Sequence, residues 1–327
     1  MAKARQRLTD RKPISQSAAG AVKKPASKKT TPITKAKAAP AGRGIAGQVL
    51  LFQPYRTVTE KAQCDIACTP IQLTSTRPDL YAALNWINQS VGSAQSPVGK
   101  AALWGIIPRD FVQRTAIPVA AWSQVVRDNP DRDVYLLNPA PAEEAIYPNP
   151  LSRIFLEFPD LQPVLPILFS ENHISASPTF SMAPYLVARS GFWSAYWAYI
   201  RKEIAEIEKR AAPAQRKLLA KPQSDSPLLA GDSILSLIAG ALLPVFLKTD
   251  QGSAFKAIKI ALPAKERELN AHLNSLRQLK DAAVKAQSPW LISCWMNYRN
   301  LYVYQVNGKQ WCARHLAAIT PKKANFF

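Results

Sequence analysis

Short apolar runs alternate with stretches of helical periodicity along most of this chain. Runs rich in strand-forming side chains and bounded by breakers are typical of buried strands; they cover residues 48–52, 101–107, 134–137 and 185–187. Apolar residues recur at spacings of three and four, as on one face of a helix, over 78–91, 118–129, 192–210 and 232–246. This alternation through about residue 250 favours an α/β fold, in which helices flank a sheet.

A helical and aromatic-rich part follows from about residue 251. A helix is predicted over 263–286, where four leucines form one stripe: Leu269, Leu273, Leu276 and Leu279. The tyrosines and valine of 302–305 lead into Val-Asn-Gly-Lys at 306–309, which predicts a strand and a hairpin turn. Two segments without a clear period, 151–169 and 213–227, are expected to be a loop with short pieces and a polar linker.

Charge separates the first 44 residues from the rest. Residues 1–44 hold twelve Lys or Arg and one Asp, a net charge of +11 out of +20 for the whole chain. Almost no large apolar side chain occurs there, so the segment is predicted to be a disordered basic tail before a folded body at 45–327. Its cations would attract an anionic membrane or nucleic acid, and a solubility role is the simpler alternative.

The remaining composition favours a cytoplasmic protein, with the inner membrane face as a peripheral location. The four cysteines are too few and too scattered for a disulfide framework and are expected to be reduced. The N-terminus lacks the apolar region of a secretory signal. Residues 228–247 are apolar and about as long as a membrane span. Asp232 and Pro244 within them favour a buried core helix instead.

The most informative segment for chemistry is 131–150. Its apolar run, 134–137, is predicted to lie in the middle of the sheet and to end at Asn138. The loop expected beyond it carries Glu143 and Glu144. Ligands of open α/β sheets sit outside the carboxyl ends of the strands, so these three side chains are expected at the rim of a cleft. An ordinary loop with exposed acids is the alternative.

Four further residues have both a chemical and a simpler interpretation. Asp131 and Asp133 have the Asp-x-Asp spacing that suits Mg²⁺ or Mn²⁺, but they precede the strand, which favours a solvated turn. Asp232 could act as a general base, although Asp at the start of a helix is more often an N-cap. His173 could contact phosphate or act as a base, and a surface histidine is the simpler interpretation.

Several patches, taken together, resemble bacterial surface-polysaccharide glycosyltransferases of the GT-A type. They begin with the strand that is expected to end in Pro54, Tyr55 and Arg56, followed by Leu-Trp-Gly at 103–105. Next come Asp-Val-Tyr-Leu-Leu-Asn-Pro at 133–139, Ala-Pro-Tyr-Leu-Val-Ala at 183–188 and the helix after Asp232. The resemblance implies a GT-A-like mixed sheet flanked by helices.

The same resemblance implies roles for individual residues. The end of the first strand, Pro54 and Tyr55, would hold a nucleotide. Asn138, with the two glutamates that follow it, would lie at the metal–diphosphate site, and Asp232 would lie near the acceptor. The leading hypothesis is therefore transfer of a sugar from a nucleotide-sugar donor to a glycan or lipid-linked acceptor, with Mn²⁺ or Mg²⁺ as the implied metal. The alternative is a non-enzymatic polyanion-binding protein with a catalytically inactive α/β body.

Overall fold

The computed structural model describes residues 49–73, 79–90, 103–161, 180, 185–219 and 233–320. The chain divides after Gly44, and all of these residues belong to the part from Ile45 to Phe327.

Within the described residues, six strands form one sheet in the order β2-β1-β3-β5-β4-β6. β5 runs antiparallel to its neighbours β3 and β4, whereas the other pairs are parallel. The expected α/β fold with a mixed sheet is confirmed, and β4 lies inside the sheet as predicted. The strands are β1 (Val49–Tyr55), β2 (Thr69–Gln72), β3 (Leu103–Ile106), β4 (Val134–Leu137), β5 (Tyr185–Arg189) and β6 (Ala257–Ile260).

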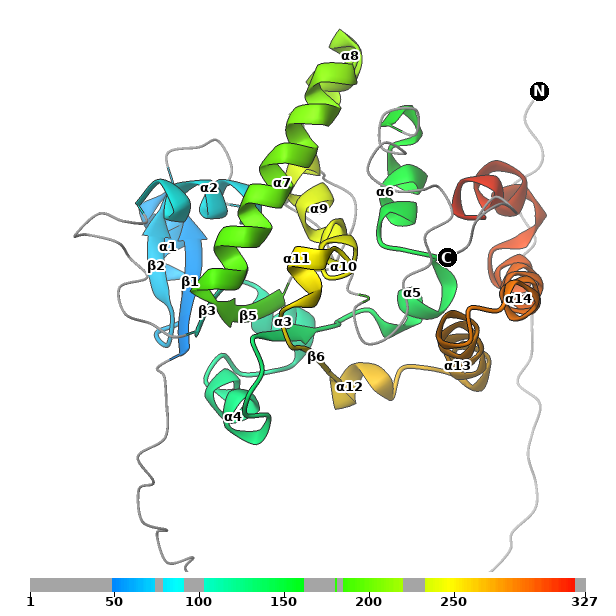
Figure 1. The fold of residues 1–327 in the computed structure, drawn as a ribbon, viewed down its shortest axis with the longest axis horizontal. Helices are drawn as coiled ribbons and strands as arrows, with labels where there is room; N and C mark the ends of the chain where they lie inside the picture. The colour runs from blue at the N-terminus through cyan, green and yellow to red at the C-terminus, as the bar shows by residue number, and fades with distance from the viewer. Residues whose placement is uncertain are drawn as a thin grey trace, which may run out of the picture. The chain divides into compact units, whose positions relative to one another are not determined.

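Helices cover this sheet and extend beyond it (Figure 1). The first group is α1 (Val58–Ala62), α2 (Leu80–Ser90), α3 (Phe111–Thr115), α4 (Ala121–Asp128), α5 (Pro141–Ile146), α6 (Leu151–Glu157) and the 3₁₀ turn η1 (Pro159–Leu161). The second is α7 (Ser190–Arg210), α8 (Pro213–Leu219), α9 (Ile234–Ala241), α10 (Leu243–Phe246) and α11 (Asp250–Ser253). The third is α12 (Pro263–Glu266), α13 (Ala271–Lys285), α14 (Pro289–His315) and the 3₁₀ turn η3 (Leu316–Ile319).

Alternate residues of each buried strand enter two different cores. Leu136 of β4 belongs to the cluster under α2, α7 and α9, while its neighbour Leu137 belongs to the cluster with α3 and α4. This is the period of two that a strand imposes. In the larger cluster, Trp104 of β3 stacks on Trp193 of α7 at 4.6 Å between ring centroids, and the indole of Trp193 donates to the main-chain oxygen of Trp104 at 2.8 Å. The sheet is therefore a layer between two helical layers.

The first strand ends at Tyr55, as its pattern predicted. It continues through Pro54 and Tyr55, which pair with Ile71 and Gln72 of β2. Proline removes a hydrogen-bond donor and normally interrupts a central strand. Here the strand pairing with β3 stops at Phe52, so the missing N–H of Pro54 falls beyond the β3 ladder.

The two edge strands were not anticipated from the sequence. β2 has one buried residue out of its four, and every residue of β6 is partly exposed. Edge strands are short and partly solvated, so neither β2 nor β6 produces the apolar run by which the central strands are recognised.

Several helix predictions need correction. α6 and η1 agree with the short pieces expected at 151–169, whereas the expected linker at 213–227 begins with the helix α8. The single helix expected over 263–286 is divided, because Asn270 caps a new helix by accepting a hydrogen bond from the N–H of Leu273 at 2.9 Å. The strand and hairpin expected over 302–309 are wrong, since residues 302–307 are helical, but the chain does break at Gly308, whose φ of 79° and ψ of 173° interrupt α14. Packing of α14 against α13 overrides the strand propensity of the tyrosines and valines there.

The apolar segment 228–247 is described from residue 233 onwards. It forms the two short helices α9 and α10, and seven of the eight residues of α9 are buried in the core. No helix in the described ranges is long and apolar enough to cross a membrane.

Candidate functional site

The order of the strands fixes where a ligand site is expected. From β1 the chain moves to β2 on one side, and it then returns to β3 on the other side of β1. The connections that leave β1 and β3 therefore diverge at the carboxyl ends of these two strands. Open α/β sheets bind their ligands at such a switch point. The candidate site is accordingly formed by the segments that follow Tyr55 and Ile106.

A buried glutamine holds these segments together. The side-chain amide of Gln53 donates to the main-chain oxygen of Pro108 at 3.1 Å, and its oxygen accepts from the N–H of Asp65 at 2.6 Å. Gln53 is 1% exposed, so both bonds are shielded from water. One side chain thus joins β1, the end of β3 and the turn before β2. In the sequence, Gln53 stands out as a polar residue next to an apolar run.

Cationic side chains lie around this junction. Glu60 closes a capping box with Thr57, and its carboxylate accepts from the N–H of Arg56 at 2.7 Å. The guanidinium of Arg109 contacts the same carboxylate at 3.2 Å. The ammonium of Lys61 lies 5.8 Å from the ring centroid of Tyr55. Three cations and one carboxylate therefore converge here, and we call Arg56, Glu60, Lys61 and Arg109 the switch-point cluster.

The carboxylate of this cluster is held in its charged form. Burial alone would raise the pKa of Glu60, but hydrogen bonds from the backbone of Arg56 and Thr57 and the charge of Arg109 outweigh it and lower the pKa. The side chain of Arg109 is 27% exposed and that of Arg56 is 49% exposed. The guanidinium of Arg109 also donates to the side-chain oxygen of Gln63 at 2.8 Å. Both guanidinium groups are therefore partly exposed to solvent and also have partners within the chain.

The end of β4 differs from the exposed loop that the sequence suggested. Glu143 and Glu144 lie in the first turn of the helix α5. The Glu144 carboxylate is buried, pairs with the ammonium of Lys259 and accepts from the side-chain amide of Asn138 at 2.8 Å. Glu143 forms an ion pair of 3.6 Å with Arg153. Because the side chains of Asn138 and Glu144 are hydrogen-bonded to each other in the protein interior, they do not form the rim of an open cleft.

A buried lysine completes this interior network. The ammonium of Lys280 in α13 donates to the main-chain oxygens of Glu144 and Tyr147, both at 2.7 Å, and it lies 4.4 Å from the ring centroid of Phe180. Burial lowers the pKa of Lys280 to about 7, against the opposing charges of Glu144 and Asp281. Lys280 follows Leu276 by four residues on the apolar stripe of α13, and this position is the sequence signal for its burial.

Asp131 and Asp133 precede β4. They therefore lie at the end of the sheet opposite to the carboxyl ends of β1 and β3. Asp131 has a left-handed backbone, with φ of 62°, and is exposed. Asp133 pairs with Arg189 at 2.9 Å and accepts from the N–H of Lys256 at 2.9 Å. These contacts join the starts of β4 and β6 to the end of β5, and they agree with a structural turn.

Two expected site residues, His173 and Asp232, lie outside the described residues. The N-cap expected at Asp232 is corrected, because the cap of α9 is Ser233, whose hydroxyl accepts from the N–H of Ser236 at 3.2 Å.

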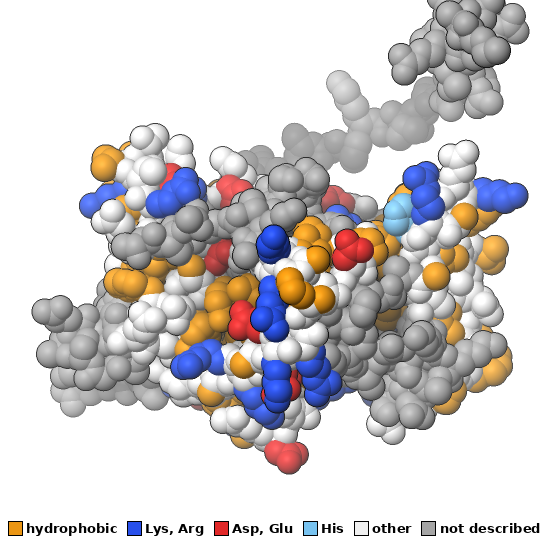
Figure 2. Space-filling model, turned by 90° about the horizontal axis from the view of Figure 1, so that it is seen from above, with side chains coloured by type: hydrophobic (Ala, Val, Ile, Leu, Met, Phe, Trp, Pro, Cys, Tyr) orange, Lys and Arg blue, Asp and Glu red, His pale blue; other side chains and the backbone are white. Residues whose placement is uncertain are grey.

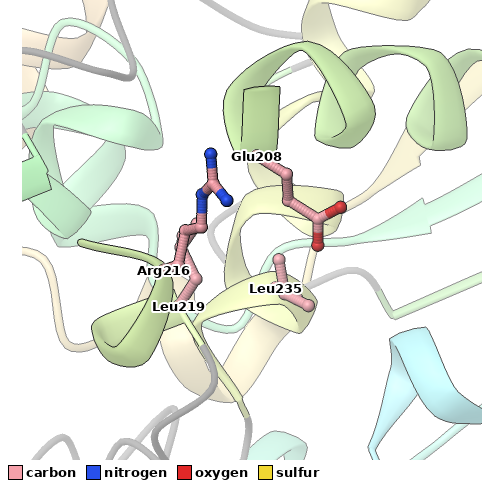
Figure 3. A pocket seen from close by; sticks show the side chains of 4 residues that line it. All are labelled: Glu208, Arg216, Leu219 and Leu235. Carbon is pink, nitrogen blue, oxygen red and sulfur yellow. The ribbon is translucent and has the colours of Figure 1, made fainter. Parts of the chain in front are cut away.

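A small hollow lies elsewhere in the described part of the chain (Figure 3). Its volume is about 230 Å³, and its lining includes Glu208 of α7, Arg216 and Leu219 of α8, and Leu235 of α9. None of these residues was singled out by sequence.

The metal implied by the glycosyltransferase resemblance was tested against the residues present. In the described ranges, no group of three or more His, Cys, Asp or Glu side chains is placed to hold an ion. Of the carboxylates expected to serve as ligands, Glu144, Glu143 and Asp133 pair with Lys259, Arg153 and Arg189. Asp131 lies in the exposed turn before β4. The described residues therefore do not fit a metal–diphosphate centre at the end of β4.

Comparison of the chain with protein-family models, curated proteins and solved structures found no match.

Proposed function

We propose that the body from Ile45 to Phe327 is a GT-A-like glycosyltransferase. It would transfer a sugar from a nucleotide-sugar donor to a glycan or lipid-linked acceptor. The observation that carries the proposal is the cationic switch-point cluster at the carboxyl ends of β1 and β3. A mixed sheet with an antiparallel strand between parallel ones agrees with the sheet that the resemblance implies.

The donor diphosphate would lie against Arg56 and Arg109. Planar guanidinium groups bind phosphate oxygens through two parallel hydrogen bonds. During transfer, negative charge develops on the diphosphate leaving group, and fixed cations near it lower the barrier. Glu60 orients Arg109 through their 3.2 Å contact. The resemblance assigns Tyr55 to nucleotide binding, and the proposal retains this role. The side chain of Tyr55 is largely buried.

The remaining roles come from the resemblance alone. Asp232 would accept the proton of the attacking hydroxyl in a reaction that inverts the sugar configuration. Mn²⁺ or Mg²⁺ would have to be held by residues other than the paired carboxylates at the end of β4, and no step is assigned to it.

Nucleotide binding gives the direct test. The thermal midpoint of the full chain should rise with a nucleoside diphosphate or its sugar ester, with or without Mn²⁺, because a ligand that binds the folded state stabilises it. Arg109→Gln should weaken this binding by about 10- to 100-fold, as expected for the loss of a charged hydrogen bond. Arg127→Gln removes an exposed arginine from α4 and is the matched control. Equal ligand responses in the two variants, or no response in the parent chain, would contradict the proposal.

Transfer activity separates binding from chemistry. Asp232→Asn should keep the nucleotide response and lose turnover. Full turnover in this variant would remove Asp232 from the mechanism.

A second function is favoured by a different observation, the net charge of +11 over residues 1–44. A polyanion-binding protein with an inactive body would bind nucleic acid through this segment, with an affinity that falls steeply as salt is raised. Salt-sensitive DNA binding together with no response to any nucleotide diphosphate would favour this alternative.

A further inference from the structure

α14 is interrupted at Gly308, whose φ of 79° and ψ of 173° are not helical. The helix before this break exposes large apolar side chains on one face. Trp290 is 71% exposed, Leu301 is 66% exposed and Tyr304 is 50% exposed. They are separated by 11 and 3 residues, so at 3.6 residues per turn they lie within about 60° of one another around the helix axis. The stripe extends over about 20 Å at a rise of 1.5 Å per residue. Exposed apolar residues that share one face indicate an interaction surface more strongly than scattered ones do.

This face points away from the core. Four of the five buried residues of α14, Ile292, Trp295, Arg299 and Val303, lie on the opposite side of the helix. That side packs against α13 and α5, and the indole of Trp295 donates to the main-chain oxygen of Ala145 at 3.0 Å. The helix is thus anchored along one side and presents Trp290, Leu301 and Tyr304 along the other.

The charge around this face has one sign. α14 contains no Asp or Glu, and Asp281 is the last acidic residue of the chain. The residues after Asp281 hold six Lys or Arg, of which Lys309 and Arg314 are exposed in the part of α14 that follows the break at Gly308. In Figure 2, separate hydrophobic side chains lie along the right of the view, where Figure 1 places α14, and Lys or Arg side chains lie at its upper end. This face of α14 is therefore apolar and aromatic, the helix carries no acidic residue, and its exposed cations follow the break at Gly308.

We propose that the face of α14 formed by Trp290, Leu301 and Tyr304 docks on the surface of an anionic lipid bilayer. Interfacial helices combine an apolar face containing Trp or Leu with cationic side chains. Trp and Tyr favour the boundary between headgroups and acyl chains. Lys309 and Arg314 would meet anionic headgroups, and the cations of residues 1–44 would add to the same attraction.

A second copy of the chain fits this surface less well. Two acid-free helices brought face to face would place cations near one another without carboxylates to pair with them. Charge complementarity thus selects the bilayer. The docking is independent of the proposed transferase activity.

Vesicle co-sedimentation of the full chain tests the proposal. The protein should co-sediment with phosphatidylcholine vesicles that contain phosphatidylglycerol. Much less of it should co-sediment with pure phosphatidylcholine vesicles. The double variant Trp290→Ser/Leu301→Ser should lower partitioning into the anionic vesicles by at least about tenfold, because two large apolar side chains no longer enter the interface. Val306→Ser is the matched control. Val306 is 62% exposed, similar to Leu301, but lies about 140° around the helix from it.

High salt distinguishes the helix from the tail. Attraction by the tail is screened by salt, so the binding that persists at high salt should depend on Leu301. The replaced residues are exposed, and unchanged circular dichroism would show that the variants fold. Tyr304→Ser gives a second, milder test of the same face.

Three results would overturn the proposal. The first is equal partitioning of the double variant and the parent chain, and the second is no pelleting with anionic vesicles. The third is a dimer in sedimentation velocity that the double variant abolishes, which would assign the face to a second copy.

Discussion

Replacing Lys280 with methionine should change how the stability of the protein depends on pH. Methionine keeps the unbranched shape of the lysine but cannot donate to the main-chain oxygens of Glu144 and Tyr147. Each buried acceptor left without a donor costs about 1–3 kcal/mol. At about pH 9, where a group with a pKa near 7 is neutral, the variant should therefore be less stable by about 2–5 kcal/mol.

The pH dependence follows from the pKa of Lys280, about 7 in the folded protein against 10.5 for an unperturbed lysine. Between these values the unfolded chain binds more protons than the folded one, so stability rises with pH. The contribution of Lys280 to the free energy of unfolding is complete above its pKa in the unfolded chain. It is lost as pH falls through its pKa in the folded protein. One pKa unit corresponds to about 1.4 kcal/mol, so the rise from about pH 7 to pH 9 amounts to about 2 kcal/mol.

Urea unfolding of the two proteins at several pH values between about 7 and 9 would measure this effect. The difference in free energy of unfolding between the parent chain and Lys280→Met should grow by about 2 kcal/mol across the range. Taking the difference cancels other titrating groups that the substitution does not affect. Lys285→Met changes an exposed lysine of the same helix and should give a constant difference. A constant difference for Lys280→Met as well would refute the argument that Lys280 is buried with a lowered pKa.

Two further comparisons test the packing around the sheet by thermal or urea unfolding. Glu144→Gln should cost about 3 kcal/mol, because it leaves the charge of Lys259 without its buried partner, whereas Glu143→Gln should cost less than about 1 kcal/mol. Equal costs would show that the network is not buried. Gly105→Ala should cost at least about 2 kcal/mol, since a Cβ there would lie 2.4 Å from a main-chain oxygen of β5. Gly191→Ala meets nothing within 4 Å and should be neutral or stabilising by up to about 1 kcal/mol; a large loss there would contradict the geometry.

The buried elements were those best predicted from the sequence. β4 has the bounds that its apolar run predicted, and α7 follows its apolar spacing closely. Such elements repeat their burial pattern along the chain, so the pattern can be read locally. The edge strands β2 and β6 are only partly buried, and this local signal is missing from them.

The candidate site was predicted only in part. Tyr55 was placed at the end of the first strand, and this end does lie at the switch point. Arg109 and Gln53 were missed, because Arg109 bonds to Gln63, 46 residues away, and Gln53 bonds to Pro108, 55 residues away. Glu144 was expected at a cleft, but Lys259 and α13 enclose it. A carboxylate has the same local sequence signal whether a ligand or a distant lysine finally pairs with it.

By itself the sequence determined the α/β class, the buried strands, the long helices and the concentration of positive charge in the first 44 residues. These features depend on local periodicity and composition, which each segment carries with it. The tertiary structure decided the strand order, the position of the switch point, the burial of Glu144 and Lys280, and the helical state of 302–307. These features depend on contacts between residues far apart in the chain, and the free energy of such contacts exceeds the local preferences of the residues that form them.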